Sequence, residues 1–257
     1  LFAAFATGGA VVASQYLGRK DHASANNAAK QLLVLSIVVS TILMSICLPF
    51  RRQIISFIFG SIEEDAQRRD FTINALAYHP DRGIIDFFKG ENDLRSRTIR
   101  VIGNGLERFK EDGLRILRAL RFMTQLKFTI EPVTTAAMTA SRKWLDYVSG
   151  ERLTRELQVI FCASDIDRII AEYLPVFAQI FPELELAKNF NQHSPYHNLD
   201  LLAHTLQVMA RVEPEFILRL AALVHDLGKL HTQVMDGLVC HYPGHVDASL
   251  KIASAYS

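Results

Sequence analysis

One long uncharged run constrains this chain more than any other feature, because it sets one region apart from the rest. No charged residue occurs from Gln31 to Phe50, and Leu, Ile, Val and Ser dominate the run. An α-helix needs about 20 apolar residues to cross the hydrocarbon core of a bilayer. Residues 1–17 also carry no charge, and a basic pair follows each run. The pattern predicts two membrane-type helices; the alternative is a buried core helix of a soluble protein.

Two stretches of this region resemble the multidrug and toxic compound extrusion (MATE) transporters. They read FATGGAVVASQYLGRKD, from Phe5 to Asp21, and IISFIFGSIEEDA, from Ile54 to Ala66. The resemblance covers about a quarter of the chain and implies a fragment of an antiporter, with membrane association through residues 1–50. Two helices cannot form a transport pathway, and the apolar runs hold no carboxylate that could couple ions.

The sequence changes character between Ser61 and Asp70, where SIEEDAQRRD is polar and charged. Everything after this stretch has the composition of a soluble protein. The net charge of +1 gives no global basic field, so RNA binding would need local arginine patches. The three cysteines are far apart and predict neither a disulfide framework nor a zinc knuckle. We expect a reducing, cytoplasmic location for residues 64–257.

The stretch from Glu107 to Phe122, ERFKEDGLRILRALRF, predicts one amphipathic helix. Its polar face carries Asp112 and Arg115 as i,i+3 neighbours, with Arg118 and Arg121 further along. A carboxylate can accept from the exocyclic amine of cytosine or adenine while a guanidinium donates to the adjacent ring nitrogen. The helix therefore predicts a surface that reads a base; the alternative is a surface helix with ordinary salt bridges.

Two motifs precede this helix. RRDFTINA places Arg68, Arg69, Asp70 and Asn74 where a predicted strand, Phe71 to Tyr78, begins. Arginine binds phosphate bidentately, and aspartate can hold a ribose hydroxyl or a metal. DFFKGENDL, residues 86–94, puts carboxylates on both sides of a glycine turn. Taken alone, the first motif is equally compatible with a charged start of a strand.

In this order and spacing, the three motifs resemble the class II tRNA nucleotidyltransferases, which comprise the CCA-adding enzymes and their poly(A) polymerase relatives. The resemblance runs from about Glu64 to the end, and Lys89 replaces the first glycine of the family's turn, which is expected to loosen it. It implies CTP, ATP and the tRNA 3′ end as partners, and Mg²⁺ as cofactor. The implied nucleotide-binding residues are Arg68, Arg69, Asp70, Asn74, Asp112, Arg115, Arg118 and Arg121. A later motif, SGERLTREL, adds Arg152 and Arg155 as RNA-binding residues.

The family's catalytic carboxylates form a DxD pair upstream of Arg68 and hold two metals. In this chain the apolar region occupies that position, and none of its acidic residues lies in a glycine-turn DxD setting. We therefore expect no catalytic residues, nucleotide binding without nucleotide transfer, and an incomplete Mg²⁺ site. The alternatives are a membrane-bound fragment of a multidrug efflux transporter and a non-catalytic nucleotide- or RNA-binding module.

A second cluster comprises His204 and the later pair His225-Asp226. Imidazole and carboxylate suit a divalent transition metal, which activates bound water for phosphoester hydrolysis. The spacing resembles HD phosphohydrolase domains. Lys229 is a candidate phosphate contact, while His241 and His245 are extra ligands or, as we favour, loop residues. The alternative is that the histidines belong to the core.

Together these patterns predict a mainly α fold. We expect membrane-type helices in residues 1–62 and a small β remnant of a nucleotidyltransferase palm in residues 63–102. An all-α neck that binds nucleotide and tRNA should follow in residues 103–190, and a partial HD domain in residues 191–257.

Overall fold

The computed structural model describes residues 11, 14–16, 18–51, 53, 62–192, 199–236 and 239–256. It divides into two compact units, Leu1–Asp65 and Ala66–Ser257. The division falls inside the stretch where the sequence changes character. Most of the first predicted membrane helix, residues 1–17, lies outside the described residues.

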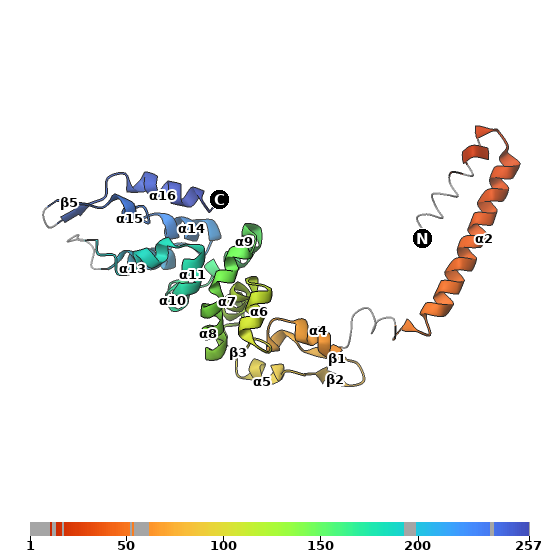
Figure 1. Ribbon diagram of the computed structural model, residues 1–257, viewed down its shortest axis with the longest axis horizontal. Coiled ribbons are helices and arrows are strands. Elements are labelled where there is room, and N and C mark those ends of the chain that lie inside the picture. Colours follow the sequence, from red (N-terminus) through yellow and green to blue (C-terminus); the bar gives the residue numbers. More distant parts are fainter. Residues whose placement is uncertain are drawn as a thin grey trace. The chain divides into compact units, whose positions relative to one another are not determined.

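The first unit contains α2 (His22–Cys47), the long helix drawn in orange in Figure 1. The helix starts at His22 because the side chain of Asp21 accepts the backbone N–H of Ser24, at 3.0 Å, and so caps its first turn. Among the described residues, α2 is the one helix that is long and apolar enough to span a membrane, and its apolar stretch is not buried within the protein. Ala25 is its one buried residue.

The second unit starts with short elements. They are α4 (Ile62–Arg68, whose first residues belong to the first unit), η1 (Thr72–Asn74), β1 (Ala77–His79), β2 (Gly83–Ile85), α5 (Gly90–Arg95) and β3 (Thr98–Ile99). The strand expected from Phe71 to Tyr78 is mostly absent. The Asn74 N–H donates to the Phe71 carbonyl at 3.2 Å and closes a 3₁₀ turn, and Asn74 Oδ1 in return accepts the Phe71 N–H at 3.1 Å, so the chain turns here instead of extending. Strands β1 and β2 form an antiparallel hairpin (Figure 1).

Helices dominate the remainder, as the sequence predicts. Figure 1 shows α6, α7, α8 and α9 gathered together, and the apolar face of α7 packs against α9. Ile116, Leu117 and Leu120 of α7 are fully buried, as are Ile160 and Phe161 of α9. The helices are α6 (Gly105–Glu111), α7 (Leu114–Leu126), α8 (Pro132–Ser141), η2 (Arg142–Tyr147), α9 (Gly150–Phe161), α10 (Ile166–Glu172), α11 (Leu174–Ile180), α12 (Glu183–Ala187), α13 (Leu201–Arg211), α14 (Phe216–Val224), α15 (Lys229–Thr232) and α16 (His245–Ser254).

The mainly α class is confirmed, but the expectation of an all-α region after residue 102 is wrong. Lys127 ends α7 in the left-handed conformation, with φ 56°, and the β-branched pair of β4 (Thr129–Ile130) then runs parallel to β3. The Thr129 N–H donates to the Arg97 carbonyl at 2.9 Å. Further along, β5 (Val234–Asp236) and β6 (Val239–His241) form an antiparallel hairpin.

Candidate nucleotide-binding site and metal cluster

The helix predicted from Glu107 to Phe122 is broken at Asp112 and Gly113. The backbone of Asp112 is extended, with φ −148° and ψ 105°, and its Oδ1 accepts the Leu114 N–H at 3.1 Å, so it caps α7. A Cβ on Gly113 would lie 2.3 Å from the Trp144 carbonyl oxygen, which explains why glycine occupies this close approach. Asp112 therefore lies before the start of α7 and does not share a helix with Arg115. The prediction that both residues lie one turn apart on a single helix is wrong.

Three of the predicted nucleotide-binding residues nevertheless converge. Arg115 Nε lies 2.9 Å from Asp70 Oδ1, and Arg118 Nε lies 2.6 Å from Asp70 Oδ2. The side chains of Arg115 and Asp70 are 13% and 14% exposed, so solvent screens this pair only weakly. The Ile102 N–H donates to the Asp70 carbonyl at 3.3 Å and fixes the backbone beneath the carboxylate.

Two residues outside the predicted set complete this cluster. Arg108 Nη2 donates to the carbonyl oxygens of Arg68, at 2.9 Å, and Arg69, at 2.6 Å. Arg115 Nη1 donates to Glu111 Oε2 at 2.7 Å, and this hydrogen bond is the main reason why the pKa of Glu111 lies below its ordinary value. The sequence could have indicated both residues, because Arg108 and Glu111 lie on the polar face of the predicted helix.

The remaining predicted residues have other partners. Arg152 Nη2 donates to Asp112 Oδ2 at 2.8 Å, so Arg152 adjoins the site. Arg121 Nε lies 2.7 Å from Glu156 Oε2. Arg155 forms an exposed i,i+4 pair with a glutamate of its own helix, and such pairs contribute little. Asn74 serves the 3₁₀ turn, and the side chains of Arg68 and Arg69 are exposed.

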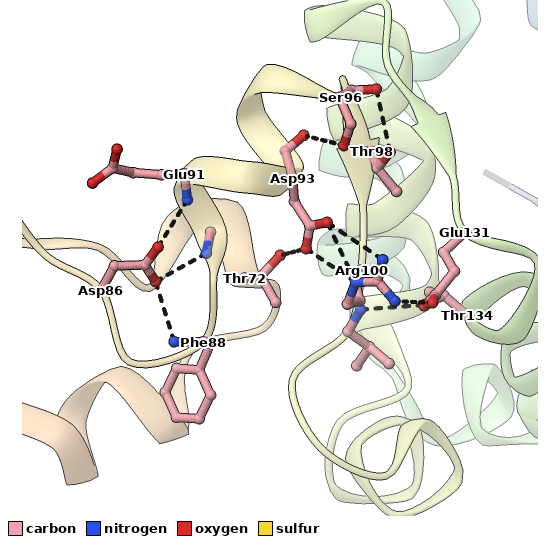
Figure 2. Close-up of polar contacts among 12 residues, drawn as sticks. Thr72, Asp86, Phe88, Glu91, Asp93, Ser96, Thr98, Arg100, Glu131 and Thr134 are labelled. Carbon is pink, nitrogen blue, oxygen red and sulfur yellow. Dashed lines mark hydrogen bonds and ion pairs between the residues drawn. The ribbon is translucent and has the colours of Figure 1, made fainter.

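The DFFKGENDL turn is firmly held (Figure 2). The carboxylate of Asp86 accepts the backbone N–H groups of Phe88, Gly90 and Glu91 at 2.9–3.1 Å. Burial alone would raise the pKa of Asp86, but these donors outweigh it and hold the pKa below its ordinary value. Lys89 adopts a left-handed conformation, with φ 60°. The loosening expected from this lysine is not seen in the hydrogen bonding of the turn.

A second polar network joins this turn to the neck (Figure 2). Asp93 is buried, accepts the Thr72 hydroxyl at 2.7 Å and pairs with Arg100 Nε at 3.0 Å. Arg100 also pairs with Glu131, which in turn accepts the Thr134 hydroxyl at 2.9 Å. One guanidinium thus bridges two carboxylates, one from α5 and one that precedes α8.

The predicted metal ligands come together. Donor atoms of His204, His225 and Asp226 all lie within 4.8 Å of one another. Nε2 of His204 lies 3.5 Å, and Nε2 of His225 3.3 Å, from Asp226 Oδ2, and His245 Nε2 lies 3.8 Å from Asp226 Oδ1. His241 and His245 were both expected in loops, but His241 ends β6 and His245 begins α16 beside the cluster. Neutral imidazole and carboxylate are suitable ligands for a divalent transition metal.

Charges within the cluster are strongly coupled. Lys229 Nζ lies 2.6 Å from Asp226 Oδ2 and 3.0 Å from Gln192 Oε1, and the amine is buried. Lys229 was predicted to contact a phosphate, but a phosphate would have to compete with Asp226 for its amine. The hydrogen bond that the His225 imidazole donates to the Asp226 carboxylate raises the pKa of His225. Burial opposes ionisation of Asp226, but His225 and Lys229 together hold its pKa well below the ordinary range.

Known proteins resemble this chain over much of its length. A family model described as "Poly A polymerase head domain" matches residues 16–100, and so runs through α2. A second, "Probable RNA and SrmB- binding site of polymerase A", matches residues 127–188. A CCA-adding enzyme of Oceanobacillus iheyensis is 44% identical over 125 residues, which are 46% of this chain and 31% of that protein. The multifunctional CCA protein of Nitrosococcus oceani is 38% identical over 200 residues, 75% of this chain and 48% of that protein.

A solved structure of the Bacillus stearothermophilus CCA-adding enzyme in complex with CTP is 27% identical and covers 76% of this chain and 43% of that chain, with a TM-score of 0.44. A TM-score this low gives no structural support beyond the sequence identity. The chain spans about a third to a half of the length of the two curated relatives. The sequence matches support the nucleotidyltransferase resemblance, whereas the transporter and HD resemblances stay predictions.

Proposed function

We propose that residues 64–257 form a tRNA nucleotidyltransferase-like unit of the CCA-adding type, which binds CTP, ATP and the tRNA 3′ end. The observation that carries the proposal is the convergence of Arg115 and Arg118 on Asp70, next to the Asp112 turn. The motifs that supply these residues lie in a chain whose curated relatives are CCA-adding enzymes.

The hydrogen-bonding capacity of the site suits a base with an amine beside a ring acceptor. The Nε and Nη1 atoms of Arg115 serve Asp70, Glu111 and the Arg108 carbonyl, which leaves Nη2 to donate to a ring nitrogen. Each oxygen of Asp112 accepts one protein donor and has a second lone pair for an exocyclic amine. Arg118, with the exposed Arg68 and Arg69, would then meet the phosphates.

Nucleotide transfer needs paired carboxylates for two Mg²⁺ ions, and the residues present do not fit this requirement. Ahead of Arg68 the acidic residues are Asp21, Glu63, Glu64 and Asp65, and none of them forms a DxD pair after a glycine turn. We therefore assign no transfer step to this polypeptide. Between the alternatives, this feature favours a nucleotide- and RNA-binding module over a complete polymerase.

Calorimetric titration of the full chain with CTP and ATP tests the binding. Asp112→Ala should weaken binding about 5- to 100-fold, because one charged hydrogen bond to the base is lost. Asp81→Ala, which removes a carboxylate exposed on a turn, is the matched control and should bind like the parent. Absence of CTP and ATP binding by the parent protein would disprove the site. Incorporation of labelled CMP or AMP into tRNA that lacks its CCA end would disprove the loss of transfer.

We also infer a divalent transition-metal site of the HD phosphohydrolase type at His204, His225, Asp226 and His245. The support is the mutual approach of their donor atoms. Elemental analysis after equilibration with Mn²⁺ or Zn²⁺ should find metal in the parent and in His231→Ala, an exposed histidine on α15, and less in His225→Ala. Equal metal content in all three proteins would remove the proposal.

Finally, we propose that α2 associates with membranes, while residues 64–257 stay in the cytoplasm. The support is its uncharged length from Gln31 onward and its unburied apolar surface. After expression in cells, the chain should resist alkaline carbonate extraction, and a variant with two lysines in place of Val38 and Leu43 should be released. Release of both proteins would refute the anchor. The efflux-transporter alternative predicts the same fractionation but no binding of CTP or ATP.

A further inference from the structure

An aromatic pair lies on the surface of η2, and neither of its rings has a role in the sites described so far. The rings of Trp144 and Tyr147 have centroids 5.5 Å apart and are tilted by 40°. A 3₁₀-helix has three residues per turn, so these two side chains lie one above the other, while Leu145 faces the core. Tyr147 is 80% exposed and Trp144 is half-buried. Two adjacent rings therefore present an accessible aromatic surface.

Basic side chains surround this surface. Lys143 Nζ lies 5.2 Å, and Lys110 Nζ 5.9 Å, from the centroid of a Trp144 ring, and both lysines are exposed. Arg142, also exposed, is the residue that begins η2. The acid of the same segment, Asp146, accepts both of its hydrogen bonds from Gln179 Nε2, at 2.8 and 3.0 Å. Aromatic rings with adjacent cations bind unpaired nucleotides by stacking on the base and pairing with the phosphate.

The same segment is joined to the Asp112 turn. The Trp144 carbonyl is the atom that Gly113 approaches so closely, and Lys110 belongs to α6, which ends just before Asp112. A base stacked on the rings would consequently lie next to the nucleotide-binding cluster. A partner protein offers a weaker match, because the two exposed lysines beside the rings favour a polyanion.

We propose that Trp144, Tyr147, Lys110 and Lys143 form a stacking platform for an unpaired base at the 3′ end of RNA. The rings hold the base, and the lysines pair with the flanking phosphates. The identification of the RNA end as substrate rests on the proposed function, whereas the platform itself rests on the aromatic and basic residues of η2 and α6.

Trp144 is the single tryptophan of the chain, so its fluorescence reports directly on the platform. The full-length protein is titrated with an RNA hairpin that has a four-nucleotide single-stranded 3′ end, and with the same hairpin made blunt. The overhang should quench the fluorescence saturably, and the blunt hairpin should bind at least 5-fold more weakly. Tyr147→Ala should weaken overhang binding about 5- to 150-fold. Lys143→Ala should reduce the slope of log K against log salt by about 0.7.

Two exposed residues elsewhere give matched controls. Tyr78→Ala removes a comparably exposed tyrosine on β1, and Lys251→Ala removes an exposed lysine on α16. Both variants should bind the overhang like the parent. The platform is refuted if Tyr147→Ala and Lys143→Ala behave like these controls, or if the overhang leaves Trp144 fluorescence unchanged. CTP binding that Asp112→Ala weakens in the same preparations would then leave the proposed function standing.

Discussion

Gly113→Ala is the substitution that most directly tests how the candidate site is assembled. The backbone of Gly113 is helical, with φ −58° and ψ −26°, so alanine brings no backbone strain and by itself would favour the helix by about 0.5–1 kcal/mol. Its Cβ, however, would lie 2.3 Å from the oxygen and 2.5 Å from the carbon of the Trp144 carbonyl. Backbone atoms cannot rotate away as a side chain does, so η2 and the start of α7 must separate.

The net cost follows from these two opposing effects. Overpacking of this kind costs about 1–3 kcal/mol, and after the helical gain of about 0.5–1 kcal/mol we expect Gly113→Ala to lower the free energy of unfolding by up to about 2.5 kcal/mol. Gly150→Ala is the matched control, because no atom lies within 4 Å of the added Cβ. It should leave stability unchanged or raise it by up to about 1 kcal/mol.

Urea denaturation, followed by Trp144 fluorescence and by circular dichroism at 222 nm, measures both changes. Because the clash also displaces Asp112, CTP binding should weaken in Gly113→Ala and stay at the parental level in Gly150→Ala. The reasoning is refuted if the two variants have the same midpoint and the same affinity for CTP. Lower stability with unchanged CTP affinity would show that the close approach supports the fold but does not position Asp112.

Three further substitutions test other contacts by the same denaturation assay. Arg100→Met leaves the buried Asp93 carboxylate without its cation and should lower the free energy of unfolding by about 1–3 kcal/mol, a range that allows for solvent screening because Arg100 is 43% exposed. In the control Arg95→Met, which changes an exposed arginine, the free energy of unfolding should stay within about 0.5 kcal/mol of the parent. Because the pKa of Asp86 is lowered in the folded protein, its ionised carboxylate stabilises the fold at pH values above 3.8, the ordinary pKa of aspartate. This contribution is lost as the pH falls through the folded-state pKa. The free energy of unfolding should therefore fall less steeply from pH 5 to pH 2 in Asp86→Asn than in the parent. Arg219→Met leaves two backbone carbonyls without their buried donor and should cost about 2–4 kcal/mol, so a loss below 1 kcal/mol would contradict that role.

The sequence predicted which side chains gather at the candidate nucleotide-binding site better than it predicted their pairing. The polar face of one continuous helix placed Asp112 next to Arg115, and periodicity gave no sign of a break. The break depends on the close approach of Gly113 to Trp144, a contact between residues 31 positions apart. Once the helix ends at Glu111, the local Asx cap turns Asp112 towards Arg152. A prediction based on one continuous helix could show neither the contact of Gly113 with Trp144 nor the pairing of Asp112 with Arg152.

The candidate metal cluster was more predictable, because its residues lie on or directly after apolar helices that must bury one face. His204 lies within α13, and His225 and Asp226 follow α14, which packs against α13. His245 was misjudged because its neighbours, a glycine and a proline, indicate a loop. The left-handed Gly244 instead precedes the first residue of α16, and that helix carries the imidazole to Asp226.

The contacts that hold the RRDFTINA motif are compatible with the proposed binding of nucleotide without transfer chemistry. Its backbone is held by later parts of the chain: the Thr72 N–H donates to the Arg100 carbonyl at 2.9 Å, and the Ile102 N–H donates to the Asp70 carbonyl. From the other side, α7 holds the Asp70 carboxylate through two arginines. The ion pairs of this carboxylate come from α7 and not from the hairpin of β1 and β2, on which Tyr78 and Ile84 are exposed. Because the position of Asp70 depends on α7 and on residues 100–102, the candidate nucleotide-binding cluster can form independently of the carboxylates that a polymerase would need.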